Sequence, residues 1–115
     1  MIKFHLEQAA DGKEIVLDEP LAFTFCGTTY TVPAGFRSDG MSVPRWLWPV
    51  ISPQITAQTL EPSIIHDYLY YIKVSTREEA DQWYYLALIE NGYSERKAKI
   101  VFRAVRLFGG RHWGQ

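Results

Sequence analysis

The chain has 115 residues, of which 47% are hydrophobic and 15% aromatic, so it is long enough to fold as one domain, 1–115, around its own core. Its net charge is -1, from 12 lysines and arginines against 13 acids, which excludes a general electrostatic attraction to nucleic acid. The single cysteine, Cys26, excludes an internal disulfide, and we expect it to lie in a strand as a small apolar residue.

The first residues alternate polar and apolar side chains from Met1 to Glu7, without a basic region followed by a long apolar one, so we expect no signal peptide. The longest apolar stretch is interrupted at Pro44, Pro49 and Pro53. No window approaches the roughly eighteen uninterrupted apolar residues of a membrane span, and we therefore expect no transmembrane segment.

Residues 1–33 alternate as short strands do, and they are predicted to form two β-hairpins in a small antiparallel sheet. Apolar residues recur at every second position from Ile2 to Leu6, and a turn signal at Asp11-Gly12 separates them from a second β-rich run. The second hairpin is predicted over residues 21–32, where alternating and β-branched residues flank Gly27.

Residues 34–60 are predicted to form a structured loop and a short helix. Turn-forming residues crowd the segment from Pro33 to Pro44, which has the period of neither a helix nor a strand. A single helical turn is predicted from Arg45, and we expect Pro49 to end it. Loops of about twelve residues are often functional, so this segment is a candidate for part of a site.

Residues 61–110 are predicted to form three helices. The first runs from about Pro62 to Ile72, and the second begins with the capping-box pattern Ser75-Thr76-Arg77-Glu78 and ends at Asn91-Gly92. The third begins after the cap residue Ser94 and stops at Gly109-Gly110. The expected core stripes are Ala80, Trp83, Ala87 and Leu88 on the second helix, and Ala98, Val101, Phe102, Val105 and Phe108 on the third.

The third predicted helix also carries a basic face. Arg96, Lys99, Arg103 and Arg106 are spaced by three or four residues, which places them on one side. A solvated outer face explains the pattern, and a surface that follows phosphates is the alternative. The slightly acidic balance of the chain disfavours the alternative, so we expect no strong nucleic-acid site.

The most informative motif is an ionisable pair, His66-Asp67, inside the apolar run from Ile64 to Tyr71. Polar groups in such surroundings usually have a partner or a function. The next predicted helix carries Asp81, and an antiparallel pair of helices would set that carboxylate against His66. Tyr70 lies four residues after His66 and therefore on the same side of its helix.

One hypothesis for this pair is hydrolysis. His66 would be a general base near neutral pH, Asp81 would hold its far nitrogen, and Ser42 would support the loop. Asp67 and Asp39 would collect a water molecule or a divalent metal, calcium or zinc. In this hypothesis the catalytic residues are His66, Asp81, Asp67 and Ser42.

The alternative is that the same groups form a structural network. His66 would bond Asp81 as a satisfied core pair, and Asp67 would accept backbone amides from the loop at residues 38–43. Arg77 would pair with Asp81 on its own helix. Such a network would lock the loop against the helices without a substrate, and the sequence leaves the two interpretations open.

Aromatic residues offer candidates for a docking surface. Trp46 and Trp48 follow the long loop at a place where the sequence shows no burial partner. An exposed patch there would favour binding to another protein. With Asp39, Arg77 and Tyr70 they complete the set of candidate binding residues.

Four short motifs occur along the chain in a fixed order. They are Phe36-x-Ser38-Asp39-Gly40-Met41-Ser42-Val43-Pro44, then His66-Asp67-Tyr68-Leu69-Tyr70, then Arg77-x-x-Ala80-Asp81, then Ala104-Val105-Arg106 with Gly109 and Trp113. Together they resemble a phage and prophage family catalogued as domain of unknown function 1353, over about residues 20–113. The resemblance implies a viral or prophage origin and brings no established reaction with it. Met41 stands where that family often has a small residue.

A second, local similarity is to secreted phospholipase A2. His66-Asp67-x-x-Tyr70 on one helix and Asp81 on the next are similar to the pattern in that family. There the histidine activates a water, the adjacent aspartate binds calcium, and an aspartate on the antiparallel helix orients the histidine. The calcium loop and the disulfide framework of that family are missing here. Calcium would therefore need carbonyl groups from Arg37 to Met41.

We therefore expect an α+β fold, with a small antiparallel sheet from the N-terminal hairpins followed by a three-helix unit. The resemblance implies a phage- or prophage-encoded accessory protein, and one function open to its His-Asp polar site is hydrolysis of a cell-envelope substrate. The alternative is a non-enzymatic virion component of the tail or assembly, or a module that binds a host protein, with a structural His-Asp network. In either case the expected partner is another viral or host protein, and the expected location is the host cytoplasm or the virion.

Overall fold

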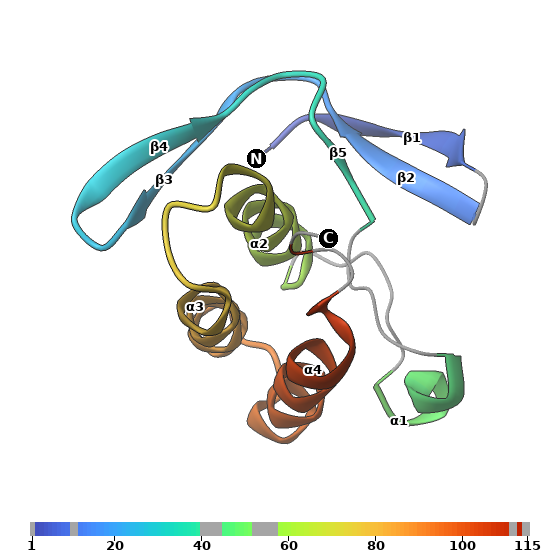
Figure 1. Ribbon diagram of the computed structural model, residues 1–115. Helices are drawn as coiled ribbons and strands as arrows, with labels where there is room; N and C mark the ends of the chain where they lie inside the picture. The colour runs from blue at the N-terminus through green and yellow to red at the C-terminus, as the bar shows by residue number, and fades with distance from the viewer. Residues whose placement is uncertain (1, 10–11, 40–44, 52–57, 111–112, 114–115) are drawn as a thin grey trace.

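The computed structural model describes residues 2–9, 12–39, 45–51, 58–110 and 113. Its architecture is α+β, with strands from the first third of the chain above three C-terminal helices, as the sequence predicts (Figure 1). The strands are β1 (Phe4–Ala9), β2 (Gly12–Leu17), β3 (Leu21–Phe25), β4 (Thr28–Val32) and β5 (Arg37–Ser38). The helical elements are the 3-10 turn η1 (Arg45–Leu47), α1 (Trp48–Ile51), α2 (Leu60–Ile72), α3 (Arg77–Glu90) and α4 (Glu95–Phe108).

The two predicted hairpins form, but they belong to two separate sheets and not to one. β1 pairs antiparallel with β2, and β5 pairs antiparallel with β2 on its other side, which gives a sheet of order β1-β2-β5. β3 and β4 form a second, two-stranded sheet with Leu21 opposite Val32. The chain passes from β2 to β3 through Pro20, which has no N–H to donate to a ladder. The second hairpin therefore turns away from the first.

Cys26 lies in the tight turn between β3 and β4 and not in a strand, so the expectation from the sequence is wrong at this residue. Cys26 and Gly27 both have positive φ angles, 52° and 81°. A two-residue hairpin turn with the right-handed twist of its strands requires such angles at both positions. The cysteine is exposed at the tip of the hairpin.

α2 lies between the strands and the other two long helices (Figure 1). Its apolar residues Ile64, Ile65 and Leu69 are buried in one cluster with residues of β2, β3 and β4, namely Ile15, Leu17, Leu21, Phe23, Phe25 and Val32. A second buried cluster joins α3 to α4 and consists of Tyr84, Leu88, Ala98, Val101 and Val105. α2 is therefore the layer on which the strands rest and against which α3 packs.

The helix starts agree with the sequence to within two residues. α2 begins at Leu60, so Pro62 lies in its first turn, where a missing N–H costs no helical hydrogen bond. α3 has the predicted capping box one residue later than expected, with Thr76 as the cap. The Thr76 side chain accepts from the N–H of Glu79, and the Glu79 carboxylate accepts from the N–H of Thr76. α4 begins after Ser94 as predicted.

Three details of the helical prediction are wrong. On α3 the expected core residues Ala80 and Leu88 are buried, but Trp83 and Ala87 are only partly buried, and Asp81 and Tyr84 are the other residues that face inward. Phe108, expected inside, is 47% exposed at the end of α4. Pro49 does not end the short helix but is the second residue of α1, since proline is tolerated in a first turn. Within the described residues, no helix is long and apolar enough to cross a membrane.

The position of the α3 cap can be tested by replacing Thr76 with Ala. We expect the free energy of unfolding to fall by about 1 kcal/mol, because the N–H of Glu79 loses its acceptor. Urea unfolding followed by circular dichroism measures the change. Ser75→Ala is the matched control, because Ser75 would be the cap in the register read from the sequence, and we expect a smaller loss there. A larger loss of unfolding free energy from Ser75→Ala than from Thr76→Ala would place the cap at Ser75.

Candidate functional site

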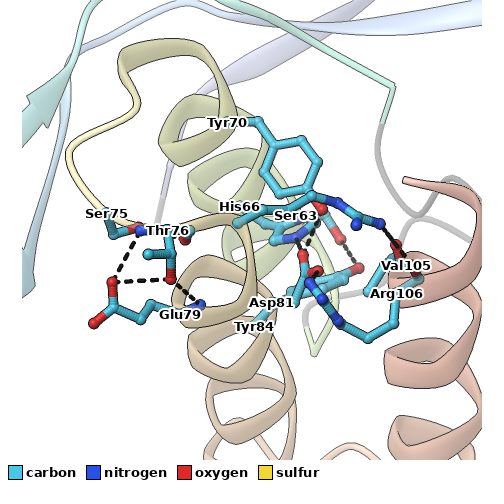
Figure 2. Close-up of polar contacts among 11 residues, drawn as sticks. Ser63, His66, Tyr70, Ser75, Thr76, Glu79, Asp81, Tyr84, Val105 and Arg106 are labelled. Atoms are coloured by element: carbon cyan, nitrogen blue, oxygen red, sulfur yellow. Dashed lines mark hydrogen bonds and ion pairs between the residues drawn. The ribbon is translucent and has the colours of Figure 1, made fainter. Parts of the chain in front are cut away.

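His66 and Asp81 face each other in the interior, as the sequence predicts. His66 lies in the middle of α2 and Asp81 in the first half of the neighbouring α3, and His66 Nε2 is 2.8 Å from Asp81 Oδ1 (Figure 2). Asp81 is 0% exposed and His66 is 6% exposed. An ionised carboxylate can only accept a hydrogen bond, so Nε2 carries the proton that points at Asp81.

Asp81 has two further partners, which come from different helices. The hydroxyl of Tyr70 on α2 donates to Asp81 Oδ1 at 2.5 Å, and Arg106 Nη1 on α4 donates to Asp81 Oδ2 at 2.8 Å. Burial raises the pKa of Asp81, but the hydrogen bonds from His66, Tyr70 and Arg106 lower it by more, so the pKa lies below its ordinary value. Asp81 is therefore ionised at neutral pH.

Aromatic rings fix the plane of the His66 imidazole. The ring of Tyr84 stacks on it with centroids 4.3 Å apart and an angle of 16°, and the ring of Tyr70 lies at 4.6 Å. The hydroxyl of Tyr84 is in turn bonded to Ser63 Oγ at 2.8 Å, in the interior. Burial raises the pKa of Tyr84, so its hydroxyl stays neutral. The hydrogen bond to Asp81 holds the edge of the imidazole, and the two rings pack against the imidazole itself.

Sequence reasoning missed Tyr84 and Ser63 as members of this cluster, although a signal for both was available. Ser63 lies three residues before His66 on α2, and Tyr84 lies three residues after Asp81 on α3. Residues at this spacing share a face of a helix. Once His66 and Asp81 are placed face to face, their neighbours at this spacing must meet as well.

The two arginines of the site have roles other than those predicted. Arg77 was expected to pair with Asp81, but its Nη2 donates to the backbone carbonyls of Val105 and Arg106 at 2.6 and 2.7 Å. It therefore supplies donors to carbonyl groups in the last turn of α4, where few backbone N–H groups follow along the helix, and the Val105 carbonyl also accepts from the N–H of Gly109. Arg106 was expected on the solvated basic face, but its guanidinium turns inward to Asp81. The antiparallel packing of α3 and α4 brings these ends together.

Gly109 allows the close approach of these groups. A Cβ atom at this position would lie 2.5 Å from the carbonyl oxygen of Val105, 2.9 Å from the hydroxyl of Tyr70 and 3.2 Å from Arg77 Nη2. The first two distances are shorter than real Cβ contacts. Position 109 therefore requires glycine because a side chain would collide with the Val105 carbonyl and the Tyr70 hydroxyl, and not only because this residue ends α4.

Asp67 faces the strands, although it is the next residue after His66. Its Oδ2 accepts from Ser38 Oγ at 2.6 Å and from the N–H of Asp39 at 3.2 Å. This confirms the predicted bond between Asp67 and a backbone amide of the loop. Burial, together with the nearby charge of Asp39, raises the pKa of Asp67 to about 7, against the effect of its two hydrogen bonds. Asp67 is thus the polar joint between α2 and β5.

The remaining candidates are placed only in part. Ser42 lies outside the described residues. Trp46 is 68% exposed on η1, with its ring edge-on to Phe108 at 6.4 Å, and of Trp48 only the backbone in α1 is described. In the ranges that the structure covers, no three His, Cys, Asp or Glu side chains gather where they could hold a metal ion. Asp67 and Asp39 are neighbours, and the hydrogen bond that joins them comes from the backbone amide of Asp39.

Comparison with known proteins places most of the chain in one family. A family model described as "Protein of unknown function (DUF1353)" matches residues 15–105. The uncharacterized protein y4jT of Sinorhizobium fredii is 34% identical over 83 residues, which are 72% of this chain and 25% of that protein. The uncharacterized protein y4iH of the same organism is 32% identical over 78 residues, 68% of this chain and 32% of that protein. The chain thus spans a quarter to a third of these curated relatives, and no solved structure matches it.

Replacing Asp81 with Asn tests the buried ion pair. We expect the free energy of unfolding at pH 7 to fall by about 2–3 kcal/mol, because Arg106 keeps its charge where the carboxylate is gone. Urea unfolding measures the loss. Glu78→Gln, an exposed change on the same helix, is the control and is expected to stay within about 0.5 kcal/mol. A loss from Asp81→Asn no larger than that of the control would contradict the pairing.

The raised pKa of Asp67 predicts a pH dependence of stability. The folded protein binds the proton of Asp67 up to about pH 7, whereas the unfolded chain releases it near the ordinary value of 3.8. The contribution of this group to stability is therefore complete below the unfolded value and is lost as the pH rises through 7. We expect the melting temperature of Asp67→Asn to rise relative to that of the wild type as the pH rises from 5 to about 7, and the difference to level off between pH 7 and 8.5, where Asp67 is ionised in both states.

Differential scanning fluorimetry over that pH range measures the effect of Asp67→Asn. Glu61→Gln, an exposed change on the same helix, is the control. A melting difference between Asp67→Asn and the wild type that stays constant with pH would show that Asp67 titrates at its ordinary value.

Proposed function

We propose a hydrolytic function for this chain. The chain belongs to the family described as "Protein of unknown function (DUF1353)", and that description names no reaction. The observation that carries the proposal is the contact between His66 Nε2 and the buried, ionised Asp81 at 2.8 Å. A histidine whose one nitrogen is held by a carboxylate is the common arrangement of a general base.

In the proposed mechanism His66 activates a water molecule. Its imidazole accepts a proton as the water oxygen bonds to the carbonyl carbon of the substrate, and the same proton then goes to the leaving group as the bond between that group and the carbon breaks. Asp81 is a positioning residue that stabilises the imidazolium formed between these steps. Tyr70 and Arg106 support this role, because their hydrogen bonds keep Asp81 ionised while it is buried.

Asp67 and Ser42 complete the proposed catalytic set. Asp67 follows His66 directly in α2, and it binds Ser38 and the amide of Asp39. These two hydrogen bonds fix the end of β5 against α2, and Ser42, which lies outside the described residues, is proposed to support the loop that follows. Calcium or zinc at Asp67 and Asp39 is not part of the proposal, because Asp67 Oδ2 already accepts two hydrogen bonds and burial disfavours its charged form.

The biological setting is a proposal of its own. The four motifs described above support a phage- or prophage-encoded accessory protein, and a cell-envelope ester or amide is the substrate that would suit such a protein. The expected location is the cytoplasm of the infected host or the virion. This part of the proposal rests on the resemblance and the hydrolytic part on the geometry.

A second candidate function is favoured by the surface at η1 and α4. Trp46 is 68% exposed and Phe108 is 47% exposed, and their rings contact each other. Exposed aromatic residues in contact are typical of a protein interface. A non-enzymatic virion component, or a module that binds a host protein, would use this patch and keep the His66 and Asp81 pair as architecture.

The experiment that separates the two functions is a turnover assay with the full chain and its His66→Gln variant. The substrates are purified bacterial cell wall, phospholipid vesicles and p-nitrophenyl esters. We expect the wild type to hydrolyse at least one of them, and His66→Gln to lower kcat/KM about 100-fold or more, as loss of a general base does. Tyr70→Phe keeps the ring and removes only one donor to Asp81, so we expect a smaller loss.

His5→Gln is the matched control for this assay. His5 also contacts two carboxylates, Glu7 and Asp18, but it does so on the exposed side of β1. We expect its rates to equal those of the wild type. Unchanged turnover in a folded His66→Gln variant, or no turnover of any of these substrates by the wild type, would reject the hydrolytic proposal and favour the second candidate.

A further inference from the structure

A groove runs along the outer side of α3 and α4. Its volume is about 480 Å³, and it is lined by Gln82, Tyr85, Leu86, Lys99, Phe102 and Arg103. On each helix the three lining residues have the spacing i, i+3 and i+4, so they form one continuous face. Two antiparallel helices thus contribute equal shares of the groove.

The groove is distinct from the core between the same helices. The buried residues of α3 are Ala80, Asp81, Tyr84 and Leu88. Of the α3 residues that line the groove, Gln82 and Leu86 are exposed, and Tyr85 is partly buried against the outer edge of the α3 and α4 cluster. Leu86 is 61% exposed, which is unusual for a leucine of a packed helix pair. The rings of Tyr85 and Phe102 contact each other at 5.6 Å and form an apolar floor.

The charge of the groove is of one sign. Among its lining side chains, Lys99 and Arg103 are cations and none is acidic. Arg96 lies three residues before Lys99 and is exposed, so it extends the same edge along α4. The whole chain carries a net charge of -1, so this basic edge is a local feature and not part of a general excess of positive charge.

We propose that this groove binds an acidic amphipathic helix of a partner protein. Apolar side chains of that helix pack on Tyr85, Leu86 and Phe102, and its carboxylates pair with Lys99 and Arg103. An amphipathic helix that lays its apolar face into a groove between helices is a recurring mode of recognition. The apolar floor favours a protein partner over nucleic acid, whose outer surface offers phosphates.

This inference is independent of the proposed hydrolysis, because it uses neither His66 nor Asp81. The probe is a synthetic helical peptide with leucines on one face and glutamates on the other, labelled for fluorescence anisotropy and titrated with the full chain. A second peptide keeps the leucines and replaces every glutamate by lysine. We expect the acidic peptide to bind at least about tenfold more tightly than the basic one.

Variants of the groove locate the binding. We expect the double change Lys99→Glu and Arg103→Glu to weaken binding of the acidic peptide about tenfold or more, and Leu86→Ser to weaken it about fivefold. Leu107→Ser is the matched control, because Leu107 is also an exposed leucine of this helix pair, 75% exposed, but does not line the groove. Its affinity for the acidic peptide is expected to be unchanged.

Four outcomes would overturn the inference. They are equal affinity for the two peptides, equal weakening by Leu86→Ser and Leu107→Ser, dimerisation of the chain that Leu86→Ser abolishes, and binding of duplex DNA or anionic vesicles but not of the acidic peptide. The third would assign the groove to a second copy of this chain, and the fourth to nucleic acid or a membrane surface.

Discussion

The carboxylate of Asp81 is the point at which the three long helices are joined. It is fully buried, and it receives hydrogen bonds from His66 and Tyr70 on α2 and from Arg106 on α4. A buried charge is tolerated only when its partners are in place, so no one of these helices can shift without exposing or unpairing it. Arg77 makes a second link between α3 and α4. It lies on α3 and donates hydrogen bonds to backbone carbonyls at the end of α4.

A second polar joint, at Asp67, connects the helices to the strands. Adjacent residues of a helix point about 100° apart, so α2 presents His66 to α3 and Asp67 to β5. The pKa values of the two carboxyl groups are shifted in opposite directions. Hydrogen bonds lower the pKa of Asp81, whereas burial raises the pKa of Asp67 to about 7. The joint among the helices is therefore charged at neutral pH, and the joint to the strands titrates there.

Both proposals use residues of α3, and these residues lie on different sides of the helix. Asp81 points into the interior and positions His66, whereas Gln82, the next residue, lines the outer groove. Membership of the family assigns no chemistry, so the hydrolytic proposal depends on the geometry of the dyad, and the binding proposal depends on the charge and apolar floor of the groove. The two proposals use different residues, and a result on one leaves the other standing.

The sequence by itself determined the fold class, the two hairpins, the helix ends and the pairing of His66 with Asp81. The strands and helices follow from local rules, since strand alternation, capping residues and the spacing of three or four residues all act within a few residues of chain. The pairing of His66 with Asp81 follows from the short connection between two consecutive helices, which makes them antiparallel neighbours. Only the tertiary structure decided that the hairpins belong to separate sheets, that Tyr84 stacks on His66, and that Arg106 and not Arg77 pairs with Asp81. Periodicity tells which residues share a face of a helix, but the rotation of each helix and the side to which a long side chain turns depend on its neighbours. Those neighbours are distant in the sequence and are set by packing.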